Sequence, residues 1–182
     1  TQEWVPHTYP PMVVDAPLDL GTIQMFPGYH FFGEVIGSDG LPIEAADFDA
    51  EYSATEIAIT INNDTTNNNG EFDILLPQGS ILLEIDPPSV GPVRQSVVLP
   101  LDVVAGAPID LGFILLPDGV LLSGRCIDST GVPVGLVDVE LFDSATGTLY
   151  LTIHENGAPD GTFSFAIDPG NYDLMLIPPA GS

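Results

Sequence analysis

The sequence contains no lysine and only two arginines against 26 acidic residues, so its formal net charge is −24. With only two basic side chains no positively charged patch can form, which excludes nucleic acid and anionic membrane surfaces as partners. The lack of lysine also excludes catalysis through a lysine Schiff base. A single cysteine excludes an internal disulfide bond. No apolar run approaches the roughly 18 residues of a membrane span, so we expect no membrane insertion.

The composition is nevertheless that of a folded protein. Hydrophobic residues make up 45% of the chain, enough to bury a core, which excludes a disordered acidic tail. Uncompensated carboxylates keep a protein soluble but repel one another in the compact state. A salty or calcium-bearing exterior would screen this repulsion, so we expect an extracellular or cell-surface protein. The cytosol of a halophile is the alternative.

The chain contains an internal repeat with an offset of 91 residues. Residues 16–21 recur at 107–112, and 22 of the 77 pairs from 15/106 to 91/182 are identical without a gap. Shared glycines and prolines fix turns and bulges, so the two copies should share one fold. Residues 1–27 match 92–118, the end of the first copy, so we expect the 182 residues to be two whole periods.

Strand signals are dense, whereas helix signals are weak. Runs of apolar and β-branched residues predict strands at 29–36, 43–52, 71–76 and 80–85, with Gly, Pro, Asn and Asp clustered between them. In residues 46–52 apolar and acidic side chains alternate, which predicts a half-buried strand with an acidic solvent face. About seven short strands per copy predict an all-β protein made of tandem β-sandwich modules.

Three glycine-containing motifs occur in each copy. They lie at 33–42, 69–72 and 77–79 in the first copy and at 124–133, 160–163 and 169–172 in the second. These motifs resemble the carboxypeptidase regulatory-like domain, to which transthyretin-like and collagen-adhesin B-type domains are related. The resemblance implies a Greek-key (immunoglobulin/transthyretin-like) β-sandwich and says little about function. The Lys–Asn crosslink common in collagen-adhesin domains is impossible in a chain without lysine.

The family pattern implies three segments. We expect residues 28–117 to form the first β-sandwich repeat, and residues 118–182 a second repeat that lacks its closing strands. Residues 1–27 have the sequence type of the missing strands and would complete the second module of a neighbouring chain by strand addition. Such a contact is head-to-tail and builds a filament unless it closes into a ring. A covalent tandem array and back-folding onto the chain's own second module are the alternatives.

The expected partner is therefore another copy of the chain. The assembly strands would lie in residues 13–26, which are apolar and strand-like, with counterparts at 104–116. The residues predicted to carry assembly are Val13, Val14, Leu18, Leu20, Ile23, Met25 and Phe26.

Catalytic motifs are absent from the sequence. There is no Gly-x-Ser-x-Gly, P-loop or GxGxxG pattern. The three histidines, His7, His30 and His154, have no metal-ligand spacing to one another or to the cysteine. Cys126 aligns with Val35 on a strand, so we expect it to be a buried small side chain. We therefore predict that the protein is not an enzyme.

The loop at 62–71 is rich in oxygen ligands of the kind that calcium prefers. The EF-hand pattern fails at both of its ends, and the second copy has only Glu155, Asn156 and Asp160 there. A solvated polar turn is the simpler interpretation, and weak calcium binding is the alternative; no other cofactor is expected. The candidate calcium ligands are Asp64, Asn67, Asn69 and Glu71.

Together these features predict a structural protein, a subunit of an extracellular filament, fibre or surface stalk. The alternative is an adhesive module that binds a carbohydrate or another surface ligand, for which exposed aromatic residues should cluster on one face. The candidates are Trp4, Tyr9, Tyr29 and Tyr150, and the sequence shows no cluster.

Overall fold

The computed structural model describes residues 3–6, 12–149 and 157–179. All the regular elements in these residues are β-strands, and none of the described residues forms a helix of the length and hydropathy that crosses a membrane. The strands are β1 (Tyr29–Gly37), β2 (Asp47–Tyr52), β3 (Ile57–Ile59), β4 (Glu71–Leu76), β5 (Gly79–Asp86), β6 (Val97–Val103), β7 (Ile109–Leu116), β8 (Val120–Arg125), β9 (Asp138–Asp143), β10 (Thr162–Ile167) and β11 (Tyr172–Ile177).

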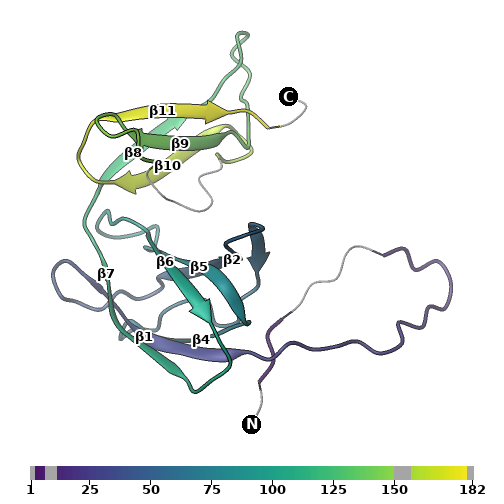
Figure 1. Cartoon of the computed structure of the whole chain (residues 1–182). Helices are drawn as coiled ribbons and strands as arrows, with labels where there is room; N and C mark the ends of the chain where they lie inside the picture. Colours follow the sequence, from purple (N-terminus) through teal and green to yellow (C-terminus); the bar gives the residue numbers. More distant parts are fainter. Residues whose placement is uncertain (1–2, 7–11, 150–156, 180–182) are drawn as a thin grey trace.

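Two strand-built bodies follow one another along the chain, the first from β1 to β7 and the second from β8 to β11 (Figure 1). The first consists of two sheets, one in the order β4-β1-β7 and one in the order β3-β2-β5-β6. Side chains of both sheets meet in one core, in which Val35, Ile74 and Leu83 are fully buried. Two sheets packed face to face over such a core form a β-sandwich, so the predicted all-β sandwich fold is confirmed.

One of the four predicted strands begins too early. β2 starts at Asp47 rather than at residue 43, because Ala45 has a φ of 57°, in the left-handed region, where a strand cannot continue. The hydroxyl of Thr66 holds this turn by donating to the Ile43 carbonyl and accepting from the Ala46 amide. The other three predicted strands agree with β1, β4 and β5 to within one residue at each end.

The acidic face of β2 is only partly the solvent face that its alternation predicts. Asp47 is exposed, but Asp49 is half-buried and Glu51 is 8% exposed. Across the sheet, Asp47 pairs with Asp86 and Asp49 pairs with Glu84, so like charges face one another. Partial desolvation, followed by the charges of Asp49 and Asp64, raises the pKa of Asp47.

The second body repeats the strand pairs of the first. β8 pairs with β10 as β1 pairs with β4, and β9 pairs with β11 as β2 pairs with β5. The offset of 91 holds residue by residue: Gly33 lies opposite Phe72, and Gly124 lies opposite Phe163. The repeat in the sequence is therefore a repeat of strand register.

The turn before β4 is also the same as the turn before β10. Gly70 and Gly161 have φ angles of 74° and 83°. A Cβ atom at either position would lie 2.5 or 2.6 Å from the carbonyl oxygen of Val35 or Cys126, respectively. Only glycine combines this φ with so close an approach of two backbones. The shared glycines thus define the same turn in both copies.

Candidate assembly site

The two sandwiches differ in the strands that flank their shared strand pairs. In the first, β7 lies along β1 and β6 lies along β5. Among the described residues, β8 pairs with β10 alone and β11 pairs with β9 alone. The edge of β8 that faces away from β10, and the edge of β11 that faces away from β9, therefore have no partner strand among the described residues. An open edge presents unpaired N–H and C=O groups to which another strand can add.

The open edges expose side chains that are buried in the first sandwich. Leu83 of β5 is 0% exposed, whereas its counterpart in β11, Leu174, is 48% exposed. Val35 of β1 is also 0% exposed, but its counterpart Cys126 is half-buried. The prediction of a buried cysteine is therefore wrong for this structure, because no described strand lies beside β8 where β7 lies beside β1.

β7 joins β1 through a β-bulge, where the parallel register shifts between Phe32 and Gly33. At this point Gly112 has a φ of 67°, and its amide donates to the Asp110 carboxylate at 2.8 Å. A Cβ atom on Gly33 would lie 2.6 Å from the Gly112 carbonyl oxygen. The bulge therefore needs glycine on both strands.

The N-terminal segment has the local geometry of this bulge although it lies in none of the described strands. Gly21 has a φ of 63°, and its amide donates to the Asp19 carboxylate at 2.9 Å. These residues match Gly112 and Asp110 in the repeat. The conformation of the bulge is therefore set by its own sequence. The Asp-Leu-Gly triplet, which occurs at 19–21 and at 110–112, is the sequence pattern from which this bulge could have been predicted.

The base of the N-terminal segment is fixed to the first sandwich by a short antiparallel bridge. Residues 3–5 pair with residues 26–28 through N–H···O bonds of 3.0 and 2.9 Å. The connection between the sandwiches has the same bridge, in which residues 93–95 pair with 117–119 through bonds of 2.9 and 3.0 Å. The segment thus reproduces the junction between the sandwiches as well as the bulge.

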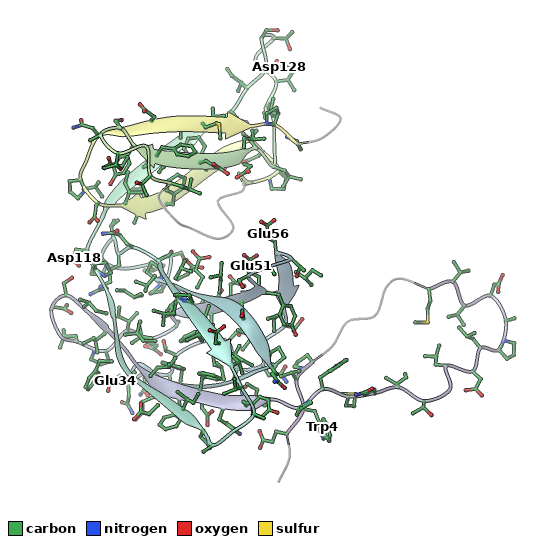
Figure 2. All side chains as sticks on the ribbon, viewed as in Figure 1. Trp4, Glu34, Glu51, Glu56, Asp118 and Asp128 are labelled. Atoms are coloured by element: carbon green, nitrogen blue, oxygen red, sulfur yellow. The ribbon has the colours of Figure 1, made fainter. Side chains whose placement is uncertain are left out.

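Polar side chains fix that junction. The guanidinium of Arg94, 9% exposed, lies 3.4 Å from the Asp39 carboxylate and 4.0 Å from that of Asp118. The side-chain amide of Gln95 donates to the Asp118 carbonyl and to the carboxylate of Asp168 in the second sandwich. Figure 2 shows Asp118 at this link. One of the two arginines of the chain therefore stabilises the junction between the sandwiches.

At the N-terminal bridge, His30 links the bridge to the sheet. Its Nδ1 lies 2.6 Å from the Asp73 carboxylate and its Nε2 lies 3.1 Å from the Glu3 carboxylate. The hydrogen bond to Asp73 raises the pKa of His30, and the charges of both carboxylates add to this effect against a partial desolvation. The sequence indicated no partner for His30, because these carboxylates come from distant segments. His7 and His154 lie outside the described residues.

The residues predicted to carry assembly all lie in the described part of the N-terminal segment, and none belongs to a strand. Their side chains are between 40% and 86% exposed. Figure 1 shows residues 12–26 as a long loop that projects to one side of the first sandwich, beside the start of β1. A run of exposed apolar side chains of this kind marks an interaction surface. The seven residues are Val13, Val14, Leu18, Leu20, Ile23, Met25 and Phe26.

The calcium candidates form a turn whose polar atoms bond to one another. The side-chain oxygen of Asn67 accepts from the amides of Asn69 and Glu71, and its NH₂ group donates to the Glu71 carboxylate. The fourth candidate, Asp64, bonds outside this turn: its backbone carbonyl accepts a hydrogen bond from the Phe48 amide. In the described residues no three His, Cys, Asp or Glu side chains gather as metal ligands. Calcium binding stays a prediction.

The aromatic candidates do not gather in the described residues. Trp4 is 50% exposed at the N-terminal bridge, whereas Tyr29 packs against the first core. Tyr9 and Tyr150 lie outside the described residues. A cleft of about 200 Å³ lies between this bridge and β3, lined mainly by apolar residues that include Val5 and Phe26.

Comparison with known proteins assigns no family. No family model and no curated protein matches the chain. The Bacillus anthracis TIE protein is 15% identical with a TM-score of 0.36, over 85% of this chain and 29% of that one. The streptococcal ancillary pilin is 14% identical with a TM-score of 0.40, over 83% and 54%. The shaft pilin SpaA of Lactobacillus rhamnosus GG is 13% identical with a TM-score of 0.34, over 85% and 89%. The chain thus spans less than two thirds of the first two proteins.

Proposed function

We propose that this chain is a structural, non-catalytic subunit of an extracellular filament, fibre or surface stalk built from tandem β-sandwiches. One observation carries the proposal. The N-terminal segment reproduces the bridge and the bulge of the first sandwich's closing part, and the matching edges of the second sandwich have no partner among the described residues. Modules joined in line make extended rods in which neighbours stabilise one another.

Two modes of assembly fit the open edges. In the first, residues 1–27 of one chain complete the second module, residues 118–182, of a neighbouring copy head to tail. In the second, the repeat continues within one polypeptide, and the junction is an ordinary peptide bond. The module boundaries at 28–117 and 118–182 belong to this proposal, as does the resemblance to the carboxypeptidase regulatory-like domain.

The charge supports a location outside the cell. With 26 acidic and two basic residues, the surface needs screening by salt or divalent cations, which the exterior supplies. Calcium at residues 62–71 would be one such cation. The Lactobacillus rhamnosus GG protein is named a shaft pilin, and a shaft is one assembly of the kind we propose.

Electron microscopy of the purified chain at micromolar concentration, with and without calcium, tests the proposal. Filaments with an axial period of two sandwiches support strand addition, and a chain lacking residues 1–27 should then form none. Filaments that persist after this deletion contradict strand addition. Discrete particles of the full chain contradict non-covalent assembly and favour the covalent array.

A carbohydrate-binding module is the second candidate. The observation that favours it is the exposed Trp4, whose neighbour Val5 lines the apolar cleft beside β3. A glycan array separates the two functions, because a filament subunit should bind no glycan. A glycan signal that is lost in a Trp4→Ala variant would favour the binding module over the filament.

A further inference from the structure

We propose that residues 18–25 of one copy add to the open edge of β8 in a second copy, parallel to it and in the register that β7 has on β1. The inference rests on the proposed head-to-tail assembly. It adds to that assembly the donor strand, the acceptor edge and the register, each of which can fail while the assembly itself stands.

The internal repeat sets the register. In the first sandwich Gly112 of β7 lies opposite Gly33 of β1. One period back from β7 lie residues 18–25, and one period forward from β1 lie β8 and the residues that follow it. The pairs expected between copies are Leu18–Leu122, Asp19–Ser123, Gly21–Gly124, Thr22–Arg125, Ile23–Cys126, Gln24–Ile127 and Met25–Asp128.

The bulge is the first feature of the donor that fits the acceptor. Pairing through it needs a positive φ and an Asp–amide bond on the donor, and Gly21 and Asp19 have both before any partner is present. It also needs glycine on the acceptor, since a Cβ on Gly33 would lie 2.6 Å from the partner's carbonyl oxygen. The acceptor residue in β8 is Gly124. Donor and acceptor therefore match at the point where the backbones approach most closely.

The alternation of side chains is the second feature. In β7, Ile114 and Leu116 enter the core and are 6% and 0% exposed. Their counterparts Ile23 and Met25 are 46% and 48% exposed. Thr22 lies between Ile23 and the bulge. It is polar, and it corresponds to a residue of β7 that faces outward. The segment thus carries an apolar face for the second core and a polar residue on the other face.

The occupant is a second copy because the segment cannot reach β8 of its own chain. Phe26 is fixed in the bridge at the start of β1, and Met25 is next to it. β1 has nine residues, which span about 26 Å at the usual 3.3 Å per residue. Its far end is the one beside the link to β8, where the Asp118 amide donates to the Ser38 hydroxyl. In Figure 2, Asp128 lies on the side of the second sandwich that faces away from the first.

Pairing of this kind would join two copies as the two sandwiches are joined within one chain. Residues 117–119 lead from β7 into β8, and residues 93–95 bridge them. Residues 26–28 lead from the donor segment into β1, and residues 3–5 bridge them in the same way. The link from the donor strand to the sandwich that follows it is therefore already built.

A disulfide between copies tests the register directly. Cys126 is the only cysteine, and the proposed pairing places it opposite Ile23. Neighbouring strands lie about 4.8 Å apart, within the Cα–Cα range of a disulfide. Oxidation of the full-length Ile23→Cys chain under assembly conditions should give a ladder of disulfide-linked oligomers on a non-reducing gel. The wild-type chain can give no product beyond a dimer.

Thr22→Cys is the matched control, since its side chain would face away from Cys126, and the ladder should be lost. Equal ladders from both variants, or filaments that give no ladder, overturn the register while the proposed assembly stands. A compact crosslinked monomer from Ile23→Cys shows pairing within one chain and overturns the second copy as the partner. The absence of both filaments and ladder overturns the inference together with non-covalent assembly.

Discussion

β5 and β11 are equivalent strands of the two sandwiches, and they differ in burial and in what lies beside their second edge. β5 pairs with β2, and β11 pairs with β9, in the same register. β5 also has β6 beside it, and Leu83 is 0% exposed; β11 has no second partner among the described strands, and Leu174 is 48% exposed. Local sequence therefore sets the strand pair, whereas burial is a property of the completed sheet.

The largest expected effect comes from truncating this matched pair of leucines. In the dispersed chain Leu83→Ala should lower the free energy of unfolding of the first sandwich by about 2–5 kcal/mol, because it leaves a cavity in a packed core. Leu174→Ala should lower that of the second by less than about 1 kcal/mol, since its side chain is half in water. Urea unfolding followed by hydrogen exchange in each sandwich measures both. Equal losses would mean that the second core is already closed.

The two equivalent turns, before β4 and before β10, should respond alike to substitution of their glycines. Gly70→Ala and Gly161→Ala should each cost on the order of 1–3 kcal/mol, because alanine would be strained at this φ and would crowd a carbonyl oxygen. Gly40→Ala is the control, since Gly40 has a φ of 75° but open space around it, and its cost should be lower. Thermal unfolding of the three variants measures these losses of stability. A neutral Gly161→Ala would show that the second turn differs.

The aspartates of the two bulges should separate folding from assembly. Asp110→Ala removes a hydrogen bond within the first sandwich and should cost about 0.5–1.5 kcal/mol. Asp19→Ala removes the same bond from a segment outside the described strands, so the dispersed chain should keep its stability and only the assembly should weaken. Urea titration and the concentration at which filaments appear measure the two effects. A loss of stability from Asp19→Ala would contradict this account.

The smallest expected effect is a pH dependence confined to the first sandwich. The folded pKa of His30 is raised, so its contribution is fully present below the unfolded value of 6.5 and is lost as pH rises through the folded pKa. Raising the pH from about 6 to about 8 should therefore destabilise the first sandwich slightly, because the ion pairs are part-exposed. The second sandwich has Leu121 in this place.

His30→Gln should remove this dependence and leave the second sandwich unaffected. Hydrogen exchange of each sandwich at the two pH values gives the comparison. An identical pH response in the wild-type chain and in the variant would show that His30 has no part in it.

Much of the fold could be predicted because it depends on local signals. The strands at 29–36, 71–76 and 80–85 and the turn glycines follow from alternation and from backbone conformations that only glycine adopts easily. The start of β2 could not be predicted, since it depends on Thr66 reaching back to a turn near Ala45. Nor could the burial of Glu51, which depends on what covers the sheet.

The candidate site was predictable in its residues but not in its geometry. The repeat indicates the donor segment because its residues match those of β7. The bridge between residues 3–5 and 26–28 was missed, because Trp4 corresponds to Arg94 at an offset of 90 rather than 91. An alignment of the two copies without gaps does not reveal this change of one residue in the offset. The two bridges are recognised as equivalent only in the structure, where each one holds the residues that lead into the next sandwich.

Deuterium uptake of β8, measured in dispersed chains and in filaments of the same protein, tests whether the edge of β8 receives a strand from another copy. Amide exchange in residues 120–125 and in residues 18–25 should slow together on assembly. Exchange in residues 29–37 should not change, because β1 already has β4 and β7 on its two edges. Equal uptake of β8 in both states would contradict the claim that its open edge receives a strand from another copy.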